Sequence, residues 1–337
     1  MTRRHLSAIA PSCSIAHRSS PKLIAQARVQ HAKTLYVVGG MYGNPQALDA
    51  IEDMLQEERG DVDVLFNGDF NFFNANLEDL DLINRRIMRF YSATAGNIEI
   101  SISSEERGSE GCGCDYPSYV SRDVVARSDL IVKKLGEVAG NLDADVLSWL
   151  RALSPFANYC IGGARVAILH GDPHSLSGWS LAVENLETSS EAFRRRHGCE
   201  SHPTTTLRGS NQHCDAHDWM QAADADMFAC THTCLPFAQR VYEGPESFKA
   251  IFNNGSAGMA NFSGQPYGLL TRISESLDIP KGSIYGCKQG EARVDCLPVQ
   301  FHHKEFVEWF LKTWPSGSPA HTSYFTRELR FPHLLMT

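Results

Sequence analysis

The sequence predicts an α/β fold, and two observations on its pattern carry this prediction. Short apolar runs of strand length alternate with segments whose apolar residues recur at helical spacing. Several of these runs end in turns rich in glycine and polar residues, the place where ligands collect in open α/β sheets. The chain has 337 residues, 42% of them hydrophobic, and can therefore bury a large core. We expect a single domain over residues 34–337.

The first four elements alternate between strand and helix. Leu35–Val38 is a short buried strand that ends at two glycines, and Val62–Phe66 is the next strand. Between them, Pro45–Glu58 carries apolar residues at helical spacing and begins with a proline, which suits a first helical turn. A second helix is expected at about Leu77–Phe90. This order is typical of an α/β fold.

The remaining elements continue this pattern, apart from one polar segment. Residues 184–218 are rich in polar residues, His, Ser and Thr, and we expect them to form a surface insertion. Further helices are expected at 124–139, 144–153 and 304–312. Further strands are expected at 165–169, 226–230, 248–256 (a strand followed by a turn), 267–273 and 292–299.

The composition argues against several classes of function. The formal charge of -8 disfavours broad, non-specific binding of nucleic acid. The chain has no long, unbroken apolar run, so we expect no membrane span. We recognise no signal peptide, so the ten cysteines are expected to be free thiols in a reducing compartment, and we expect a cytoplasmic protein.

The first 33 residues contain no Asp or Glu but several Arg, Lys and Ser residues. Such a composition is found in organellar transit peptides, in disordered tails and in chains whose start is placed too far upstream. We expect residues 1–33 to be a disordered extension, with an organellar location as the alternative if they form a transit peptide. The sequence leaves the oligomeric state open.

Four polar residues lie in tight turns and have the chemistry of metal ligands. Asp69 and Asn97 each follow a glycine, and His170 and His232 each follow a predicted strand. Their mixed nitrogen and oxygen donors suit Mn, Fe, Zn or a similar divalent ion. Any one of them alone is more often a hydrogen-bonding residue than a ligand. Four of them in tight, mostly glycine-flanked turns favour a metal site, because glycine lets the backbone approach a ligand closely.

At these motifs the chain resembles the calcineurin-like metallophosphoesterase superfamily, over roughly residues 35–300. The family motifs are Asp-x-His, Gly-Asp, Gly-Asn-His-Glu, a His after a strand, and Gly-His-x-His. Their counterparts occur here in the same order, as Gly40-Met41-Tyr42, Gly68-Asp69, Gly96-Asn97-Ile98-Glu99, His170 and Thr231-His232-Thr233-Cys234. The resemblance implies a four-layer α/β/β/α sandwich with two metal positions at the carboxyl ends of the strands.

The resemblance also implies a role for each matching residue. Asp69 matches the carboxylate that bridges the two metals of the family. Asn97, His170 and His232 match ligands of the second metal, so the second position is complete. Asn44 matches the Asn that follows the first motif.

The chain departs from the family at the first metal position. Gly40 stands where the family has its first Asp, Tyr42 where it has its first His, and Cys234 where it has the last His. Cys234 is a suitable ligand for zinc and stays a candidate, whereas Gly40 has no side chain and Tyr42 binds a metal only as a phenolate. We therefore expect the first position to be empty or rebuilt, and one bound divalent ion. Ile98 replaces the His that protonates the leaving group or steadies the phosphate, and it can do neither.

The resemblance implies a divergent metal-dependent phosphohydrolase that acts on a small phosphomonoester or phosphodiester. General acid or base help contributes about 10²- to 10⁴-fold to such reactions, so we expect weak hydrolysis unless another residue takes over. Asp69, Asp172 and His174 are the candidate catalytic residues, and Tyr42 is a further candidate acid. For His174, the segment Pro173-His174-Ser175 favours an ordinary loop residue.

Other interpretations stay open. The lost ligands favour a catalytically silent binding or scaffold protein on the same fold, and a thiol or redox protein would use Cys112, Cys114 or Cys234. The spacing of Cys112 and Cys114 is too tight for an ordinary zinc knuckle and favours a turn. The polar insertion either carries a structural zinc site or is a polar loop. Its candidate ligands are His197, Cys199, His202, His213, Cys214 and His217.

Trp179 and the segment Phe70–Phe73 are candidates for the wall of a substrate pocket. Large apolar residues near the end of a strand also pack into cores, so both placements stay open.

Overall fold

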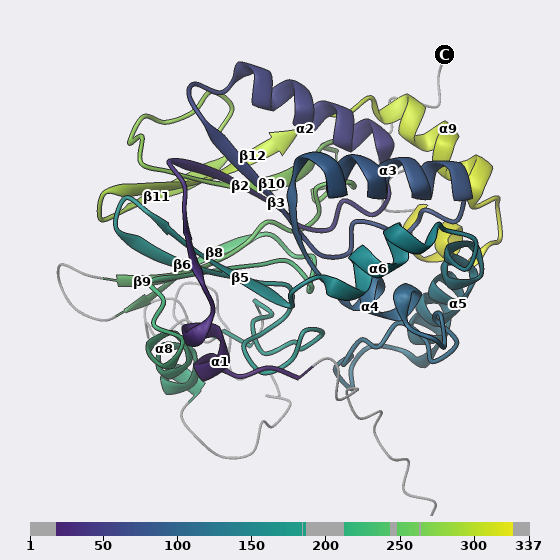
Figure 1. Cartoon of the computed structure of the whole chain (residues 1–337), viewed down its shortest axis with the longest axis horizontal. Helices are drawn as coiled ribbons and strands as arrows, with labels where there is room; N and C mark the ends of the chain where they lie inside the picture. The colour runs from purple at the N-terminus through teal and green to yellow at the C-terminus, as the bar shows by residue number, and fades with distance from the viewer. Residues whose placement is uncertain (1–17, 184, 187–211, 243–247, 263, 326–337) are drawn as a thin grey trace, which may run out of the picture.

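The computed structural model describes residues 18–183, 185–186, 212–242, 248–262 and 264–325. Within this part of the chain, two six-stranded sheets pack face to face, and helices cover the outer face of each (Figure 1). The arrangement is a four-layer α/β/β/α sandwich, so the fold class expected from the sequence is confirmed.

The first sheet combines three strands from the N-terminal third of the chain with three strands near its C-terminal end. They are β2 (Thr34–Val38), β3 (Val62–Asn67), β4 (Ser92–Thr94), β10 (Gly268–Ser274), β11 (Tyr285–Gln289) and β12 (Ala292–Val299). Their order is β11-β12-β10-β2-β3-β4. The neighbours β2, β3 and β4 are parallel, whereas β10 is antiparallel to both β2 and β12.

The second sheet is built from one N-terminal strand and five strands from the middle of the chain. Its strands are β1 (Val29–His31), β5 (Phe156–Ile161), β6 (Ala164–Leu169), β7 (Met227–Cys230), β8 (Phe237–Tyr242) and β9 (Phe248–Asn253). Their order is β1-β5-β6-β7-β9-β8. At its centre β6, β7 and β9 run parallel, so their carboxyl ends meet at one edge of the sheet.

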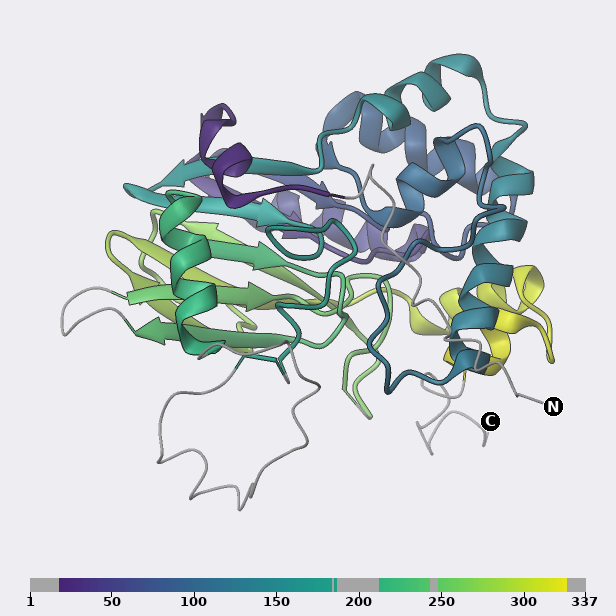
Figure 2. The ribbon, with the colours of Figure 1, turned by 90° about the horizontal axis from the view of Figure 1, so that it is seen from below.

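The helices form the two outer layers. They are α1 (Pro21–Gln26), α2 (Pro45–Glu57), α3 (Leu77–Phe90), α4 (Asn97–Ser103), α5 (Arg122–Ala139), α6 (Ala144–Ala152), α8 (Gln212–Ala222) and α9 (His303–Thr313), with a π-helical turn at His321–Phe325. Figure 1 shows α2, α3 and α9 over the first sheet, and Figure 2 shows α1 and α8 beside the second.

The buried strands divide their side chains between two cores. In β2, Tyr36 and Val38 pack under the helices of the first sheet, and Leu35 and Val37 pack between the two sheets. This alternation follows from the two-residue period of a strand. Because both faces are covered, the strand is apolar along almost its whole length, as is usual for buried parallel strands.

The helix after the first motif begins as the sequence predicts. Asn44 caps α2, its side chain accepting a hydrogen bond from the Ala47 amide at 3.1 Å, and Pro45 occupies the first helical turn. The Asn44 amide also donates to the Gly258 carbonyl at 2.9 Å. One side chain thus ends the first motif, starts α2 and ties both to the loop before β10.

The expectation of a disordered extension over residues 1–33 is wrong for its described part, residues 18–33. Helix α1 begins at a Ser20 cap and buries Ile24, and β1 pairs with β5 along its length. The Asn158 amide donates to the Ile24 carbonyl at 2.6 Å. The lack of acidic residues describes the charge of this segment and does not determine whether it folds. Residues 18–33 are ordered by their contacts with the second sheet. Residues 1–17 lie outside the described residues.

The polar insertion at 184–218 lies mostly outside the described residues, as do the candidate zinc ligands His197, Cys199 and His202. Its last part belongs to α8, which packs against α1 and the second sheet. Among the described helices, we find none that is both long enough and apolar enough to cross a membrane.

Candidate metal centre

Three ionisable side chains from the two sheets meet where the parallel strands end. Asp69 follows β3 of the first sheet, while His170 and His232 follow β6 and β7 of the second. All three are buried, and one ligand atom of each lies within 4.8 Å of the others. Three of the four residues expected as ligands therefore form a group with the spacing of a metal site.

A glycine turn brings the Asp69 carboxylate to this point. Gly68 has a φ of +70°, and a Cβ there would lie 2.5 Å from the backbone of Gly96 and 2.7 Å from Nδ1 of His170. Only glycine fits such a position. The turn is held by Glu99, whose Oε2 accepts hydrogen bonds from the amides of Asp69 at 2.7 Å and Gly96 at 3.0 Å.

One hydrogen bond sets the tautomer of His170. Its Nδ1 lies 2.9 Å from the carbonyl oxygen of Asn67, and a carbonyl can only accept, so Nδ1 carries the proton. In the neutral ring, Nε2 therefore holds a lone pair directed toward Asp69. This arrangement is usual for histidines that bind metals. The Asn67 side chain also donates to the Leu169 carbonyl at 2.8 Å, which links the two sheets at the same point.

Three further donor atoms surround Nε2 of His170. Oδ1 of Asn97 lies at 3.1 Å, Nδ1 of His232 at 3.1 Å and Oδ2 of Asp69 at 3.4 Å. Ligand atoms bound at about 2.1 Å to one divalent ion are separated from each other by roughly 3.0–3.4 Å. The donor set and its spacing therefore fit a divalent metal.

Asn97 is turned toward the centre by residues that the sequence did not assign to the site. Its Nδ2 donates to the Cys112 carbonyl at 2.7 Å and to Sγ of Cys114 at 3.3 Å, which leaves Oδ1 facing His170. The turn at Cys112-Gly113-Cys114, where Gly113 has a φ of +67°, is thus a positioning element for Asn97.

The electrostatics of the centre follow from burial and from the charges of neighbouring groups. Burial opposes charge on His170, but the nearby Asp69 carboxylate reverses the effect and raises its pKa. In the same way, His170 and His232 outweigh burial and lower the pKa of Asp69. Burial, together with the charge of Asp69, raises the pKa of Glu99 to about 7. The centre therefore contains two buried carboxyl groups, Asp69 and Glu99, whose charged forms a cation would stabilise.

Two of the residues that depart from the family pattern, Tyr42 and Cys234, are in contact with each other. The Tyr42 hydroxyl and the Cys234 thiol are hydrogen-bonded to each other. Burial raises the pKa of Tyr42, and the nearby Cys234 and Asp69 add to this, so the phenol stays neutral and is a poor metal ligand. Cys234 is absent from the group of metal-ligand spacing among the described residues. As a metal ligand it stays a prediction.

The other two candidate catalytic residues, Asp172 and His174, lie in the loop after β6. Both carboxylate oxygens of Asp172 accept backbone amides, from His174 at 2.8 Å and Ser175 at 2.9 Å on one oxygen and from Ser180 at 3.1 Å on the other. Asp172 therefore organises the loop after β6. His174 is exposed and packs edge-on against Trp219, with 5.3 Å between ring centroids. Neither residue lines the pocket described next.

A cavity of about 570 Å³ opens in front of the centre. Asp69, Asn97 and His232 lie in its wall, with Ile98 and Cys234 beside them. Six aromatic side chains line the rest: Tyr42, Phe72, Tyr116, Trp179, Phe262 and Tyr324.

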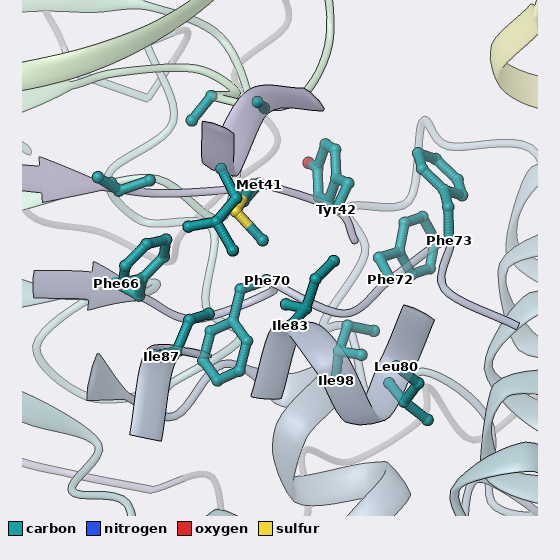
Figure 3. Close-up of a cluster of buried hydrophobic side chains, with 14 of the residues drawn as sticks. Met41, Tyr42, Phe66, Phe70, Phe72, Phe73, Leu80, Ile83, Ile87 and Ile98 are labelled. Atoms are coloured by element: carbon teal, nitrogen blue, oxygen red, sulfur yellow. The ribbon is translucent and has the colours of Figure 1, made fainter. Parts of the chain in front are cut away.

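Of the candidates for the pocket wall, Trp179 lines the cavity, and the segment Phe70–Phe73 lies partly in the cavity wall and partly in the core. Trp179 and Phe72 line the cavity, whereas Phe70 and Phe73 are fully buried in the core. Figure 3 shows Tyr42, Phe72 and Phe73 side by side, with Ile98 below them. Sequence pattern did not identify Tyr116, Phe262 or Tyr324, because they come from loops and the last turn, whose placement depends on tertiary contacts.

The comparisons with known proteins agree with this architecture. No protein-family model matches the sequence, and no curated protein matches it. Among solved structures, the chain is similar to a hypothetical protein from Pyrococcus horikoshii, with a TM-score of 0.53, 13% identity, and coverage of 87% of this chain and 97% of that one. It is also similar to a metallophosphoesterase from Sphaerobacter thermophilus, with a TM-score of 0.47, 15% identity, and coverage of 83% and 93%.

The two stacked sheets and the helices on both outer faces form the four-layer α/β/β/α fold that the chain shares with the Pyrococcus horikoshii protein. The group formed by Asp69, His170 and His232 lies where strands of both sheets end.

Proposed function

We propose that this protein is a metal-dependent phosphohydrolase that uses one divalent ion to hydrolyse a small phosphate ester. One observation carries the proposal: Asp69, Asn97 and His232 surround Nε2 of His170 at 3.1–3.4 Å. A neutral imidazole nitrogen can satisfy at most one such neighbour by hydrogen bonding. A bound cation satisfies all of them together.

The residues that would hold the ion are Asp69, Asn97, His170 and His232. A divalent ion such as Mn, Fe or Zn supplies Lewis acidity to a phosphoryl oxygen and increases the acidity of water. The remaining work falls to the chain. The Asn67 carbonyl fixes the tautomer of His170, and the two amides bound by Glu99 fix the turn that carries Asp69.

The pocket wall limits which esters can react. Ile98 is 1% exposed, belongs to the hydrophobic core and cannot donate a proton to a leaving group. Asp172 is engaged by backbone amides, and His174 lies outside the cavity wall. We therefore expect turnover to depend strongly on the leaving group, with activated esters hydrolysed fastest.

A catalytically silent binding protein is the second candidate, and the contact between Tyr42 and Cys234 favours it. These two side chains match first-site ligand positions of the family and satisfy each other by a hydrogen bond. A protein of this kind binds phosphate esters without releasing product.

Metal content and turnover of matched variants test the proposal. We expect about one Mn, Fe or Zn per chain in protein purified without chelators, and metal-stimulated hydrolysis of bis(p-nitrophenyl) phosphate. Asp69→Asn and His232→Ala should lose both, while His31→Ala, at an exposed histidine in β1, should keep both.

Unchanged metal content and turnover in Asp69→Asn would contradict the proposal. Metal binding without any turnover above the Asp69→Asn background would favour the silent binding protein.

A further inference from the structure

The cavity in front of the metal centre has almost no charge of its own. Among the described residues that line it, Asp69 is the only carboxylate, and there is no Lys or Arg. A phosphate group that enters the cavity must therefore be balanced by the metal centre itself.

The charge of the loaded centre selects among phosphate esters. A divalent cation beside the Asp69 carboxylate leaves one positive charge in excess. A phosphodiester carries one negative charge and matches it, whereas a phosphomonoester dianion or a nucleotide polyphosphate leaves negative charge unbalanced in a buried site, which is costly. The Glu99 carboxylate, buried behind Asp69, can only reduce the positive charge further.

Next to the centre, the wall of the cavity is aromatic. The ring of Trp179 lies 5.8 Å from that of His232, edge to face, and 5.7 Å from that of Tyr116. Tyr324 and Phe72 line the same cavity and pack against each other with 5.7 Å between ring centroids. Aromatic rings in a cavity wall favour offset or edge-to-face contact with a further planar ring that enters the cavity.

We propose that the cavity binds a phosphodiester monoanion that carries an aromatic ester group, with Trp179 and Tyr116 as the ring-binding wall. This inference rests on the proposed function, because it uses the metal-bound centre as the site for the phosphodiester. It names a substrate class that neither the fold nor the ligand group specifies.

The lack of an acid in the wall agrees with an aromatic ester group. In the reaction, the oxygen of water forms a bond to phosphorus, and the bond from phosphorus to the aryl oxygen breaks. The aryl oxide leaves with the bonding electron pair, takes up one proton of the water and is released as a phenol. An aryl oxide is a stable leaving group, so Ile98 in place of a proton donor costs little for such a substrate.

Calorimetric binding of three non-chromogenic probes to the metal-loaded protein tests the inference. The probes are diphenyl phosphate, phenyl phosphate and dimethyl phosphate. We expect diphenyl phosphate to bind about tenfold more tightly than either of the other two. The comparison with phenyl phosphate tests the charge together with the second ring, and the comparison with dimethyl phosphate tests the rings at constant charge.

Variants at Trp179 test whether the preference for diphenyl phosphate depends on the aromatic wall of the cavity. Trp179→Leu should reduce the preference for diphenyl over dimethyl phosphate about fivefold or more, whereas Trp179→Phe should keep most of it. Trp309→Phe is the matched control, because Trp309 lies in α9 and donates to Asp79 away from the cavity. Metal content should be the same in all three variants.

Each contrary result has a distinct meaning. Binding of phenyl phosphate equal to or tighter than diphenyl phosphate, or an unchanged ring preference in Trp179→Leu, would overturn the inference. Metal-stimulated hydrolysis lost in Asp69→Asn would then still support the proposed function. Conversely, selective binding of diphenyl phosphate that depends on Trp179, without any hydrolysis, would support the pocket assignment and overturn the proposed function.

Discussion

The phenol of Tyr42 lies in the space that a side chain at Gly40 would occupy. A Cβ built on Gly40 would come within 3.3 Å of Cζ and 3.4 Å of the hydroxyl oxygen of Tyr42. The same hydroxyl is hydrogen-bonded to Cys234. The three departures at the first metal position are therefore one structural change: the Tyr42 phenol fills the place of a missing side chain and pairs with the third replaced residue.

Restoring the family residues together should increase the number of bound metals. We expect the triple variant Gly40→Asp, Tyr42→His, Cys234→His to bind about two ions per chain where the natural protein binds about one. Gly40→Asp alone should bind no more than the natural protein and lose about 1–3 kcal/mol of stability, because Gly40 has a φ of +61° and Tyr42 crowds it. Elemental mass spectrometry and thermal unfolding measure both; two ions in the natural protein would show that the first position is already complete.

The turn that carries Asp69 should tolerate no side chain at Gly68. We expect Gly68→Ala to lower the free energy of unfolding by more than about 2 kcal/mol and to abolish metal binding, since its Cβ would overlap Gly96. Gly60→Ala is the matched control: its φ is +86°, but a Cβ there meets nothing within 4 Å, so only about 1 kcal/mol of backbone strain is expected. Equal losses in the two variants, measured by urea unfolding, would refute the steric argument.

The ion pair between Glu58 and Arg272 should make stability depend on pH. Arg272 donates to both carboxylate oxygens, at 2.7 and 2.9 Å, and Tyr36 donates to one of them at 2.8 Å. The Arg272 hydrogen bonds lower the pKa of Glu58 despite its partial burial. A lowered pKa in the folded state means that the stabilisation is complete above the ordinary pKa of Glu, about 4.3, and disappears as pH falls through the folded value.

Glu58→Gln should therefore cost about 2–4 kcal/mol near neutral pH, because it leaves the Arg272 charge buried with a weaker partner. The cost should shrink as pH falls below about 4. Urea unfolding across pH measures it, with exposed Glu57→Gln as the control expected to change stability by less than about 0.5 kcal/mol. A cost that stays constant with pH would exclude the ion pair as its source.

A histidine at position 98 should broaden the range of esters hydrolysed. We expect Ile98→His to increase turnover of poorly activated alkyl esters about tenfold or more and to change turnover of aryl esters little, because it introduces an acid into the cavity wall. The variant should lose about 1–3 kcal/mol of stability, since Ile98 is also part of the core. Ile102→His, on the same helix and outside the cavity wall, should lose stability without any gain. Steady-state rates for alkyl and aryl esters decide the matter.

The sequence predicts the centre of the fold better than its edges. It did not indicate five strands: the four edge strands of the two sheets, β1, β4, β8 and β11, and the inner strand β5. None of the edge strands carries a continuous apolar run, because an edge strand has one side open and needs less apolar surface. In β5 the polar Asn158 interrupts the apolar run, whereas the other inner strands leave a clear apolar pattern.

The candidate ligands were also easier to predict from the sequence than the residues that hold them in place. Asp69, Asn97, His170 and His232 stand next to glycines or strand ends, and this local signal makes them candidate ligands. The structure brings one ligand atom each of Asp69, His170 and His232 within 4.8 Å of one another. The roles of Glu99, Cys112 and Cys114 depend on hydrogen bonds to Asp69 and Asn97. No pattern in the sequence indicates that these hydrogen bonds form. Of these three residues, only Glu99 belongs to a motif that the sequence shows, Gly96-Asn97-Ile98-Glu99.

The ligands of the centre come from both sheets, so a bound ion is a cross-link between the two halves of the sandwich. Asp69 belongs to the first sheet, and His170 and His232 belong to the second. An ion that binds only the folded chain stabilises it in proportion to the logarithm of its concentration over its dissociation constant. A bound ion would therefore stabilise the sandwich whether or not the chain hydrolyses an ester.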